Sequence, residues 1–163
     1  MIFVDTDVLS IFAKIQRLPL LFAVFDQATL NITPAVENEI KIGVSKGFYF
    51  SHDITALQTQ GRIRIYHPTP VDREFMRSLP QTLDAGERES MAICKRFTAT
   101  LASNERRVMH HCQTNGIHCL NLVDILRLLW ELEILTQTDV RKVITKIEIK
   151  DRLKFRTTDP IFK

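Results

Sequence analysis

The sequence holds few cysteines, few glycines and no long apolar segment. Its three cysteines, Cys94, Cys112 and Cys119, are an odd number without paired spacing, and it has five glycines and six prolines among 163 residues. The longest apolar candidate, residues 18–30, is interrupted by a proline and an aspartate and falls short of the ~20 residues of a membrane span. The first residues lack the basic segment and the cleavage site of a secretory signal. We therefore expect a cytoplasmic protein with reduced thiols and no membrane partner.

The composition is that of an ordinary globular domain. Hydrophobic residues make up 45% of the chain and charged residues 25%, which excludes collagen-like, coiled-coil and disordered proteins. A chain of this length buries roughly 68–70% of the surface that the unfolded chain exposes, so a core forms without a metal or a disulfide. We expect a single domain over residues 1–163, in which any metal serves chemistry.

Positive charge is concentrated in the later part of the chain. Lysine and arginine total 22 against 19 acidic residues, which gives a net charge of +3. The first 60 residues hold few cations, whereas twelve arginines lie between Arg62 and Arg156. Guanidinium groups pair with phosphates in a bidentate manner, so this distribution favours a nucleic-acid or nucleotide ligand. A solvated helix surface explains the same arginines equally well.

Apolar periodicity predicts short strands that alternate with helices. Strands are predicted at residues 2–4, 29–33, 62–66, 98–103 and 117–120. Helices are predicted from residue 8, over 20–28, from 34, and over 54–60, 71–78, 84–97, 104–114, 122–134 and 139–150, with the helices from about 122 onward packed on the rest. This order indicates an α/β fold, a three-layer α/β/α sandwich with a mostly parallel central sheet. Ligands of such sheets bind beyond the carboxyl ends of the strands.

Three acidic clusters lie where such a ligand would bind. They are Asp5 with Asp7, Glu37 with Glu39, and Asp84 with Glu87 and Glu89. If the clusters converge, their like charges need a cation to neutralise them. Ligation by oxygen alone suits Mg²⁺ or Mn²⁺ better than zinc.

Each of these acids also has a structural interpretation. Asp5 follows a buried strand. At this position an aspartate either caps the next helix or serves as a functional site residue. Asp7 lies in the first helical turn, where it is expected to stabilise the helix dipole. Asp84 and Glu87 have the spacing of a capping box, and Glu89 has the position of a solvated helix residue. The sequence alone leaves both kinds of role open.

Four segments resemble the PIN-domain family, small metal-dependent ribonucleases that include the VapC toxins of toxin–antitoxin pairs. Residues 2–9 resemble its strand that ends in Asp-Thr-x-x-Leu, and residues 33–40 resemble its Val-x-x-Glu-Ile helix. Residues 83–92 resemble the Gly-Glu-x-Glu-Ala helix of one branch. Arg106 with Arg107 and then residues 115–117 resemble the basic helix and Gly-Ile strand that follow there. The resemblance spans residue 2 to about residue 135.

The resemblance implies an endoribonuclease that uses Mg²⁺ or Mn²⁺ and leaves a 5′-phosphate and a 3′-hydroxyl. Asp5, Glu39 and Glu87 match its catalytic and metal-binding acids, with Glu89 as the next candidate ligand. The family also implies RNA as substrate, a cognate antitoxin protein as partner and a homodimer.

The position of the family's fourth acid differs in this chain. That acid normally follows the strand predicted at 98–103, where this sequence has Ser103-Asn104 and then Glu105. Asn104 offers only a neutral carbonyl oxygen, so the site loses one formal negative charge. Three interpretations stay open: Glu105 replaces the acid, Asn104 suffices together with a water, or the protein binds RNA without cleaving it.

Two further points concern the substrate and the chemistry. Arg88, Arg106 and Arg107 are candidates to contact RNA phosphates. A PIN-like module that binds RNA or protein without catalysis is one alternative function. A second alternative is a haloacid-dehalogenase-type phosphohydrolase, in which Asp5 would be the nucleophile and Asp7 the general acid and base.

Overall fold

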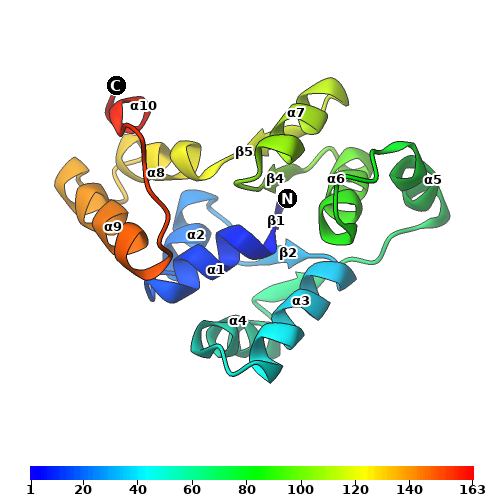
Figure 1. Cartoon of the computed structure of the whole chain (residues 1–163), viewed down its shortest axis with the longest axis horizontal. Helices are drawn as coiled ribbons and strands as arrows, with labels where there is room; N and C mark the ends of the chain where they lie inside the picture. The colour runs from blue at the N-terminus through cyan, green and yellow to red at the C-terminus, as the bar shows by residue number, and fades with distance from the viewer.

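The computed structural model describes residues 1–163 and contains one five-stranded sheet (Figure 1). The strands are β1 (Ile2–Val4), β2 (Leu30–Ile32), β3 (Ile63–Ile65), β4 (Thr100–Ala102) and β5 (His118–Leu120). Their order is β3-β2-β1-β4-β5, and every neighbouring pair is parallel. The predicted parallel α/β fold is therefore confirmed.

The central strand β1 shows why the sheet lies between two helical layers. All three of its residues are buried, and successive side chains of a strand point to opposite faces. Ile2 and Val4 belong to the apolar core beneath the first helices, whereas Phe3 belongs to a second core on the other side of the sheet. Beside Phe3 in the register, the buried amide of Asn31 donates to the carbonyl oxygen of Ile2 at 2.8 Å.

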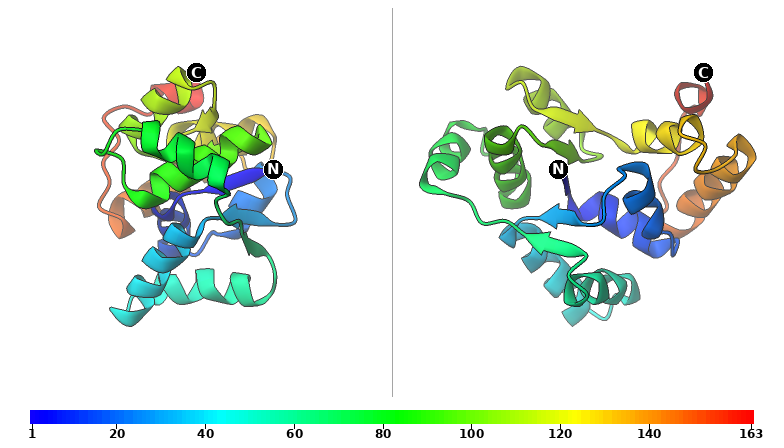
Figure 2. Two further views of the ribbon diagram at one scale, coloured as in Figure 1. Left: turned by 90° about the vertical axis from the view of Figure 1, so that its right-hand side faces the viewer. Right: turned by 180° about the vertical axis from the view of Figure 1, so that it is seen from behind.

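Ten helices surround the sheet. They are α1 (Thr6–Lys14), α2 (Pro19–Val24), α3 (Pro34–Ser45), α4 (Tyr49–Thr59), α5 (Pro70–Ser78), α6 (Ala85–Phe97), α7 (Arg106–Thr114), α8 (Leu122–Glu131), α9 (Gln137–Lys150) and α10 (Asp159–Phe162). The α3–α4 hairpin and α10 lie at opposite ends of the molecule in all three views (Figures 1 and 2). No helix is both long enough and apolar enough to cross a membrane.

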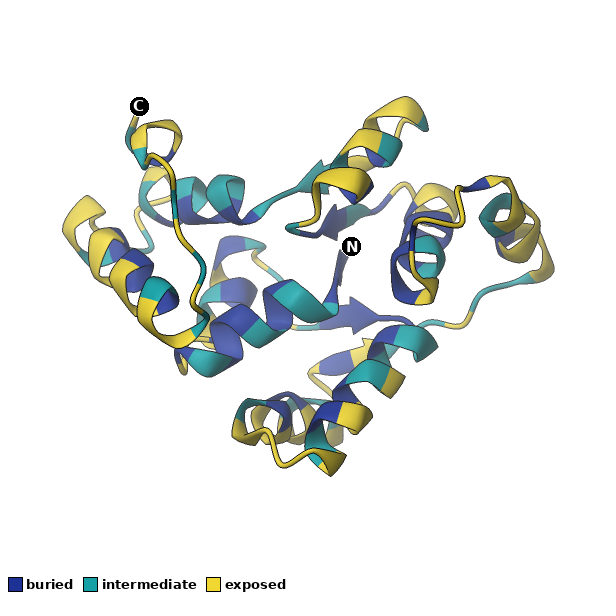
Figure 3. Ribbon diagram, in the orientation of Figure 1, coloured by how far each residue is buried: buried dark blue, intermediate teal, exposed yellow.

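The last three helices pack against the first two. Helix α9 contacts α1, and α8 contacts α2 and α10. Lys14 forms an ion pair with Asp151 at 2.5 Å, and the Trp130 indole donates to the carbonyl oxygen of Ile161 at 2.6 Å. Burial is greatest in β1, β2 and α1 and least on the outward faces of the other helices (Figure 3). The packed core fixes the position of the sheet, and with it the positions of the residues that follow the carboxyl ends of the strands.

The element order matches the sequence prediction, with differences at some boundaries and one added helix. The predicted helix 54–60 begins at Tyr49, since α3 and α4 form a tight hairpin in which a Cβ on Gly43 would lie 2.5 Å from Ser51 Oγ. The predicted helix 20–28 ends at Val24 because Asp26 takes a left-handed conformation with φ of 48°. The short helix α10 was not predicted.

Candidate active site

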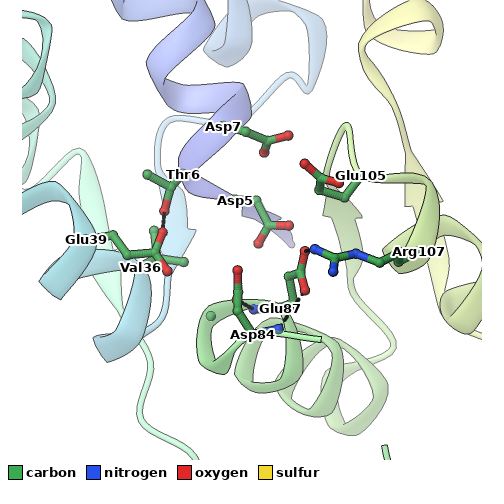
Figure 4. A pocket seen from close by; sticks show the side chains of 10 residues that line it. Asp5, Thr6, Asp7, Val36, Glu39, Asp84, Glu87, Glu105 and Arg107 are labelled. Carbon is green, nitrogen blue, oxygen red and sulfur yellow. Dashed lines mark hydrogen bonds and ion pairs between the residues drawn. The ribbon is translucent and has the colours of Figure 1, made fainter. Parts of the chain in front are cut away.

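An acidic cleft lies beyond the carboxyl ends of β1, β2 and β4 (Figure 4). It has a volume of about 300 Å³ and ten lining residues: Asp5, Thr6, Asp7, Val36, Glu39, Asp84, Gly86, Glu87, Glu105 and Arg107. They come from the ends or starts of β1, α1, α3, α6 and α7. Six of them carry carboxylates and one carries a guanidinium group, so the cleft concentrates negative charge.

Asp5 lies at the base of this cleft and is buried, with 6% of its surface exposed. Neither carboxylate oxygen has a hydrogen-bond partner. Burial raises the pKa of Asp5 to about 8, and the charges of Asp7 and Glu87 add to the rise. The hydroxyls of Ser103 and Ser90 lower the pKa in part, although neither completes a hydrogen bond to the carboxylate. A buried carboxylate without partners is ready for a cation or a proton.

Asp7 links the start of α1 to the end of β4. Its Oδ1 accepts the backbone N–H of Val8 at 2.8 Å, and its Oδ2 accepts that of Asn104 at 3.1 Å. Burial raises the pKa of Asp7 above its ordinary value. The bond from Val8 fits the predicted role at the helix start, and Asp7 also lines the cleft, as its place in one of the three acidic clusters predicted. Its signal was the Asp-x-Asp spacing after the strand.

Glu39 enters the cleft from α3 and accepts a hydrogen bond from Thr6 Oγ1. Burial raises the pKa of Glu39, and the charges of Asp84 and Glu89 contribute to the rise. On the opposite side, a Cβ built on Gly86 would lie 3.1 Å from Glu39 Oε1, so the missing side chain lets α6 approach α3 closely. The sequence interpretation assigned no role to Thr6 or Gly86.

Glu87 caps the start of α6 and also lines the cleft. It completes a capping box: its Oε2 accepts the N–H of Asp84 at 2.8 Å, and its own N–H donates to Asp84 Oδ1 at 2.8 Å. Its Oε1 lies 3.5 Å from Arg107 Nη2 in the cleft. Arg107 Nη1 also donates to the carbonyl oxygen of Thr82 at 2.8 Å. Burial raises the pKa of Glu87, and the Arg107 charge opposes that rise.

The remaining predicted site residues lie outside the lining of the cleft. Glu89 accepts the N–H of Ala35 at 2.9 Å, because it lies two residues from Glu87 and so points to another side of α6. Asn104 Oδ1 accepts the N–H of Leu122 at 3.4 Å. These contacts stabilise the starts of α3 and α8.

Two of the three predicted arginines also stand apart from the cleft. Arg88 donates from Nε to the carbonyl oxygen of Asp84 at 3.4 Å, and Arg106 is exposed at the start of α7. The structure thus brings Asp5, Glu39, Glu87 and Arg107 together, and Glu105 with them.

The donor set of the cleft fits a hard divalent cation in its chemistry. All its acidic donors are oxygens, and Asp5 provides two that nothing else satisfies. No group of three or more His, Cys, Asp or Glu side chains is gathered closely enough to hold a metal ion. Mg²⁺ commonly keeps several waters and takes only one or two carboxylates directly. One or two acids with water therefore suffice for this ion.

The fold also matches a solved structure. VapBC2 from Rickettsia felis, solved bound to a DNA fragment from their promoter, matches 74% of this chain and 98% of its own chain. The TM-score is 0.53 and the sequence identity is 16%, so the match shows a shared fold. A search of curated proteins finds no match.

A family assignment comes from the sequence as a whole. The family model DUF3368, described as a PIN domain, matches residues 1–162. The match covers all the segments that resembled this family, and neither comparison supports the haloacid-dehalogenase-type alternative. Together with the parallel sheet and the acidic cleft at its carboxyl edge, it shows that the chain belongs to the PIN-domain family.

Proposed function

We propose that this protein is a Mg²⁺- or Mn²⁺-dependent endoribonuclease that hydrolyses RNA phosphodiester bonds. One observation carries the proposal: Asp5 holds two buried carboxylate oxygens without partners at the base of a cleft lined by five more acids. Such an arrangement is destabilising by itself and becomes favourable when a divalent cation binds. Membership of the PIN-domain family supports the same chemistry.

Asp5 and Glu87 are the residues proposed to hold the cation, with Glu39 and Asp7 beside them. When bound, the ion supplies activation of a water and neutralises charge that develops on the phosphate. The Thr6 hydroxyl orients the Glu39 carboxylate, and the capping box holds Glu87 toward the cleft. No nucleophilic side chain is needed. Water would attack the phosphorus and the bond from phosphorus to the 3′-oxygen would break, so the products carry a 5′-phosphate and a 3′-hydroxyl.

Arg107 is the residue proposed to bind the substrate phosphate. It is the only cationic residue that lines the cleft, and 53% of its side chain is exposed. Its guanidinium can pair with a phosphate in the same fork geometry that carboxylates use. Arg88 and Arg106 lie outside the cleft lining and are proposed to contact the RNA backbone beyond it. Glu89 and Asn104 are then supports for the cleft, reached through Ala35 and Leu122.

A place in a toxin–antitoxin pair is part of the proposal. The match to VapBC2, solved with promoter DNA, supports a cognate antitoxin as partner. The protein is then a toxin that acts on RNA in the cytoplasm, as a homodimer.

A PIN-like module that binds RNA without cleaving it is the second candidate function. Asn104 replaces the family's fourth acid, and its side-chain oxygen bonds to Leu122 outside the cleft. Glu105 lies in the cleft lining and is the acid available to compensate.

Incubation of a mixed RNA pool with the purified protein tests the proposal. The reactions contain Mn²⁺, Mg²⁺ or a chelator, and the Asp5→Asn variant is compared with Asp26→Asn, which removes an exposed carboxylate just after α2 and outside the cleft. We expect metal-dependent cleavage by the wild type and by Asp26→Asn, and at least a hundredfold loss in Asp5→Asn. Wild-type protein that neither binds the metal nor cleaves RNA would favour the binding module instead.

A further inference from the structure

A groove adjoins the acidic cleft on the side of the α3–α4 hairpin. Its first hollow, of about 200 Å³, shares Thr6 and Glu39 with the cleft. A second hollow, of about 520 Å³, shares Phe50 with the first. We call this combined surface the aromatic groove, after Phe48, Tyr49 and Phe50 in its lining. Because it shares residues with the cleft, a chain bound in the cleft can continue along it.

The aromatic side chains form a platform with one open side. The rings of Phe48 and Phe50 are stacked, with centroids 5.4 Å apart and 13° between their planes. Phe50 is half-buried and packs on the core, whereas Phe48 is 46% exposed and Tyr49 is 89% exposed. Exposed aromatic rings beside a cleft offer faces on which bases can stack. A flat base stacked on Phe48 would extend the column that Phe50 begins.

The backbone holds this platform in place before any ligand binds. Gly47 takes a left-handed conformation with φ of 79°, and its N–H donates to the carbonyl oxygen of Val44 at 2.9 Å. The N–H of Phe48 donates to the carbonyl oxygen of Gly43 at 3.0 Å. A fixed turn spares a ligand the entropic cost of ordering the loop.

The aromatic groove carries more positive charge than the acidic cleft, so it is better suited to bind RNA phosphates. Lys46 and Lys150 line the two hollows and form no ion pair. Lys14 lies 5.0 Å from the centroid of the Phe50 ring, although Asp151 pairs with it. Asp53 is the acid of the second hollow, and Glu39 is the acid shared with the cleft. Lysines beside exposed aromatic rings are the combination that binds single-stranded nucleic acid.

We propose that the aromatic groove binds the single-stranded RNA segment next to the scissile phosphate, with bases stacked on Phe48 and Tyr49 and phosphates near Lys46. This inference rests on the proposed nuclease function and assigns part of its substrate recognition. A protein segment is the competing occupant, but exposed rings continuous with a catalytic cleft and flanked by unpaired lysines favour RNA.

Binding of a fluorescent single-stranded RNA oligonucleotide tests the inference. The buffer contains Ca²⁺ as an oxygen-binding cation, and gels confirm that the RNA stays intact. We expect Phe48→Ala and Tyr49→Ala each to weaken binding on the order of tenfold, with affinity regained in Phe48→Trp and Tyr49→Phe. Val71→Ala, which removes a side chain of a 71% exposed residue on α5, serves as the matched control and should bind as the wild type does.

A second oligonucleotide without bases separates stacking from charge. Its affinity should be unchanged in the aromatic variants and lowered in Lys46→Ala. Equal affinity of wild type and aromatic variants for base-containing RNA would overturn the inference while leaving cleavage intact. Unchanged RNA affinity together with loss of a copurifying protein would assign the groove to a protein partner, which also overturns it. A wild-type protein that binds no RNA would overturn both this inference and the proposed function.

Discussion

Replacement of the ionisable Asp5 carboxyl by an amide should stabilise the metal-free protein at neutral pH. Burial raises the pKa of Asp5 from 3.8 to about 8 in the folded state, while the unfolded chain keeps the lower value. A raised pKa in an acid contributes stability that is fully present below pH 3.8 and is lost as the pH rises toward 8. Between these limits, the free energy of unfolding falls by ~1.4 kcal/mol per pH unit.

The stability that Asp5→Asn should gain at pH 7 follows from this slope. At pH 7, about three pH units above 3.8, the folded protein still holds the Asp5 proton that the unfolded chain has released, which lowers the free energy of unfolding by about 4 kcal/mol. Asp5→Asn removes that cost but buries an amide whose hydrogen bonds are incomplete, at about 1 kcal/mol. The variant should therefore be more stable than the wild type by about 3 kcal/mol at pH 7 and by under about 1 kcal/mol at pH 5. For a chain of this size, 3 kcal/mol corresponds to a Tm about 9 °C higher.

Urea unfolding in a chelator at pH 5 and pH 7 measures both values, with Asp53→Asn as the exposed-site control. Saturating Mn²⁺ should then stabilise the wild type and leave Asp5→Asn unchanged, since only a protein that holds the ion gains from it. An Asp5→Asn variant that is less stable than the wild type at pH 7, or a difference that is equal at the two pH values, would refute the reasoning.

Three further substitutions test how the cleft is built. Gly86→Ala places a Cβ 3.1 Å from Glu39 Oε1, so it should lower the Mn²⁺ affinity measured by calorimetry severalfold. The free energy of unfolding should stay within about 1 kcal/mol of the wild type, because alanine also favours the helix. An unchanged Mn²⁺ affinity would show that Glu39 can move aside without consequence. Thr6→Val removes the hydroxyl that donates to Glu39 and should lower the rate of RNA cleavage about tenfold. Thr6→Ser keeps a hydroxyl and should cleave at the wild-type rate. Equal cleavage rates for Thr6→Val and the wild type would rule out this positioning role. Arg107→Ala frees Glu87 from its ion pair, so it should raise Mn²⁺ affinity severalfold while it weakens RNA binding. Arg73→Ala, at an exposed arginine on α5, is the control, and a lower metal affinity in Arg107→Ala would contradict the prediction.

The sequence predicted the sheet well because its strands are short and apolar. Each is followed by a helix, and Pro34 begins such a helix directly after β2, so the periodicity changes sharply there. Asp5 was recognisable because it directly follows the most buried strand. The start of α4 at Tyr49 was missed, and its first turn packs against α3, where Ser51 lies close to Gly43. Local propensity carries no information about that contact.

The details of the cleft depended on partners from distant segments. Thr6 and Gly86 gained their positions only when α1, α3 and α6 met around Glu39. Glu89 and Asn104 have the residue types of ligands, but backbone amides of Ala35 and Leu122 take up their oxygens. One oxygen of Glu87 completes the capping box that its spacing predicted, and the other faces Arg107 in the cleft, while its role in metal binding stays a prediction.

Analysis of the RNA ends tests the central claim most directly. RNA is incubated with the protein and Mn²⁺, and the new termini are identified by their reactivity toward ligase and kinase. Hydrolysis at the acidic cleft predicts 5′-phosphate and 3′-hydroxyl ends that disappear with a chelator and in Asp5→Asn. Ends that carry a 2′,3′-cyclic phosphate, or cleavage that persists in Asp5→Asn, would contradict the account.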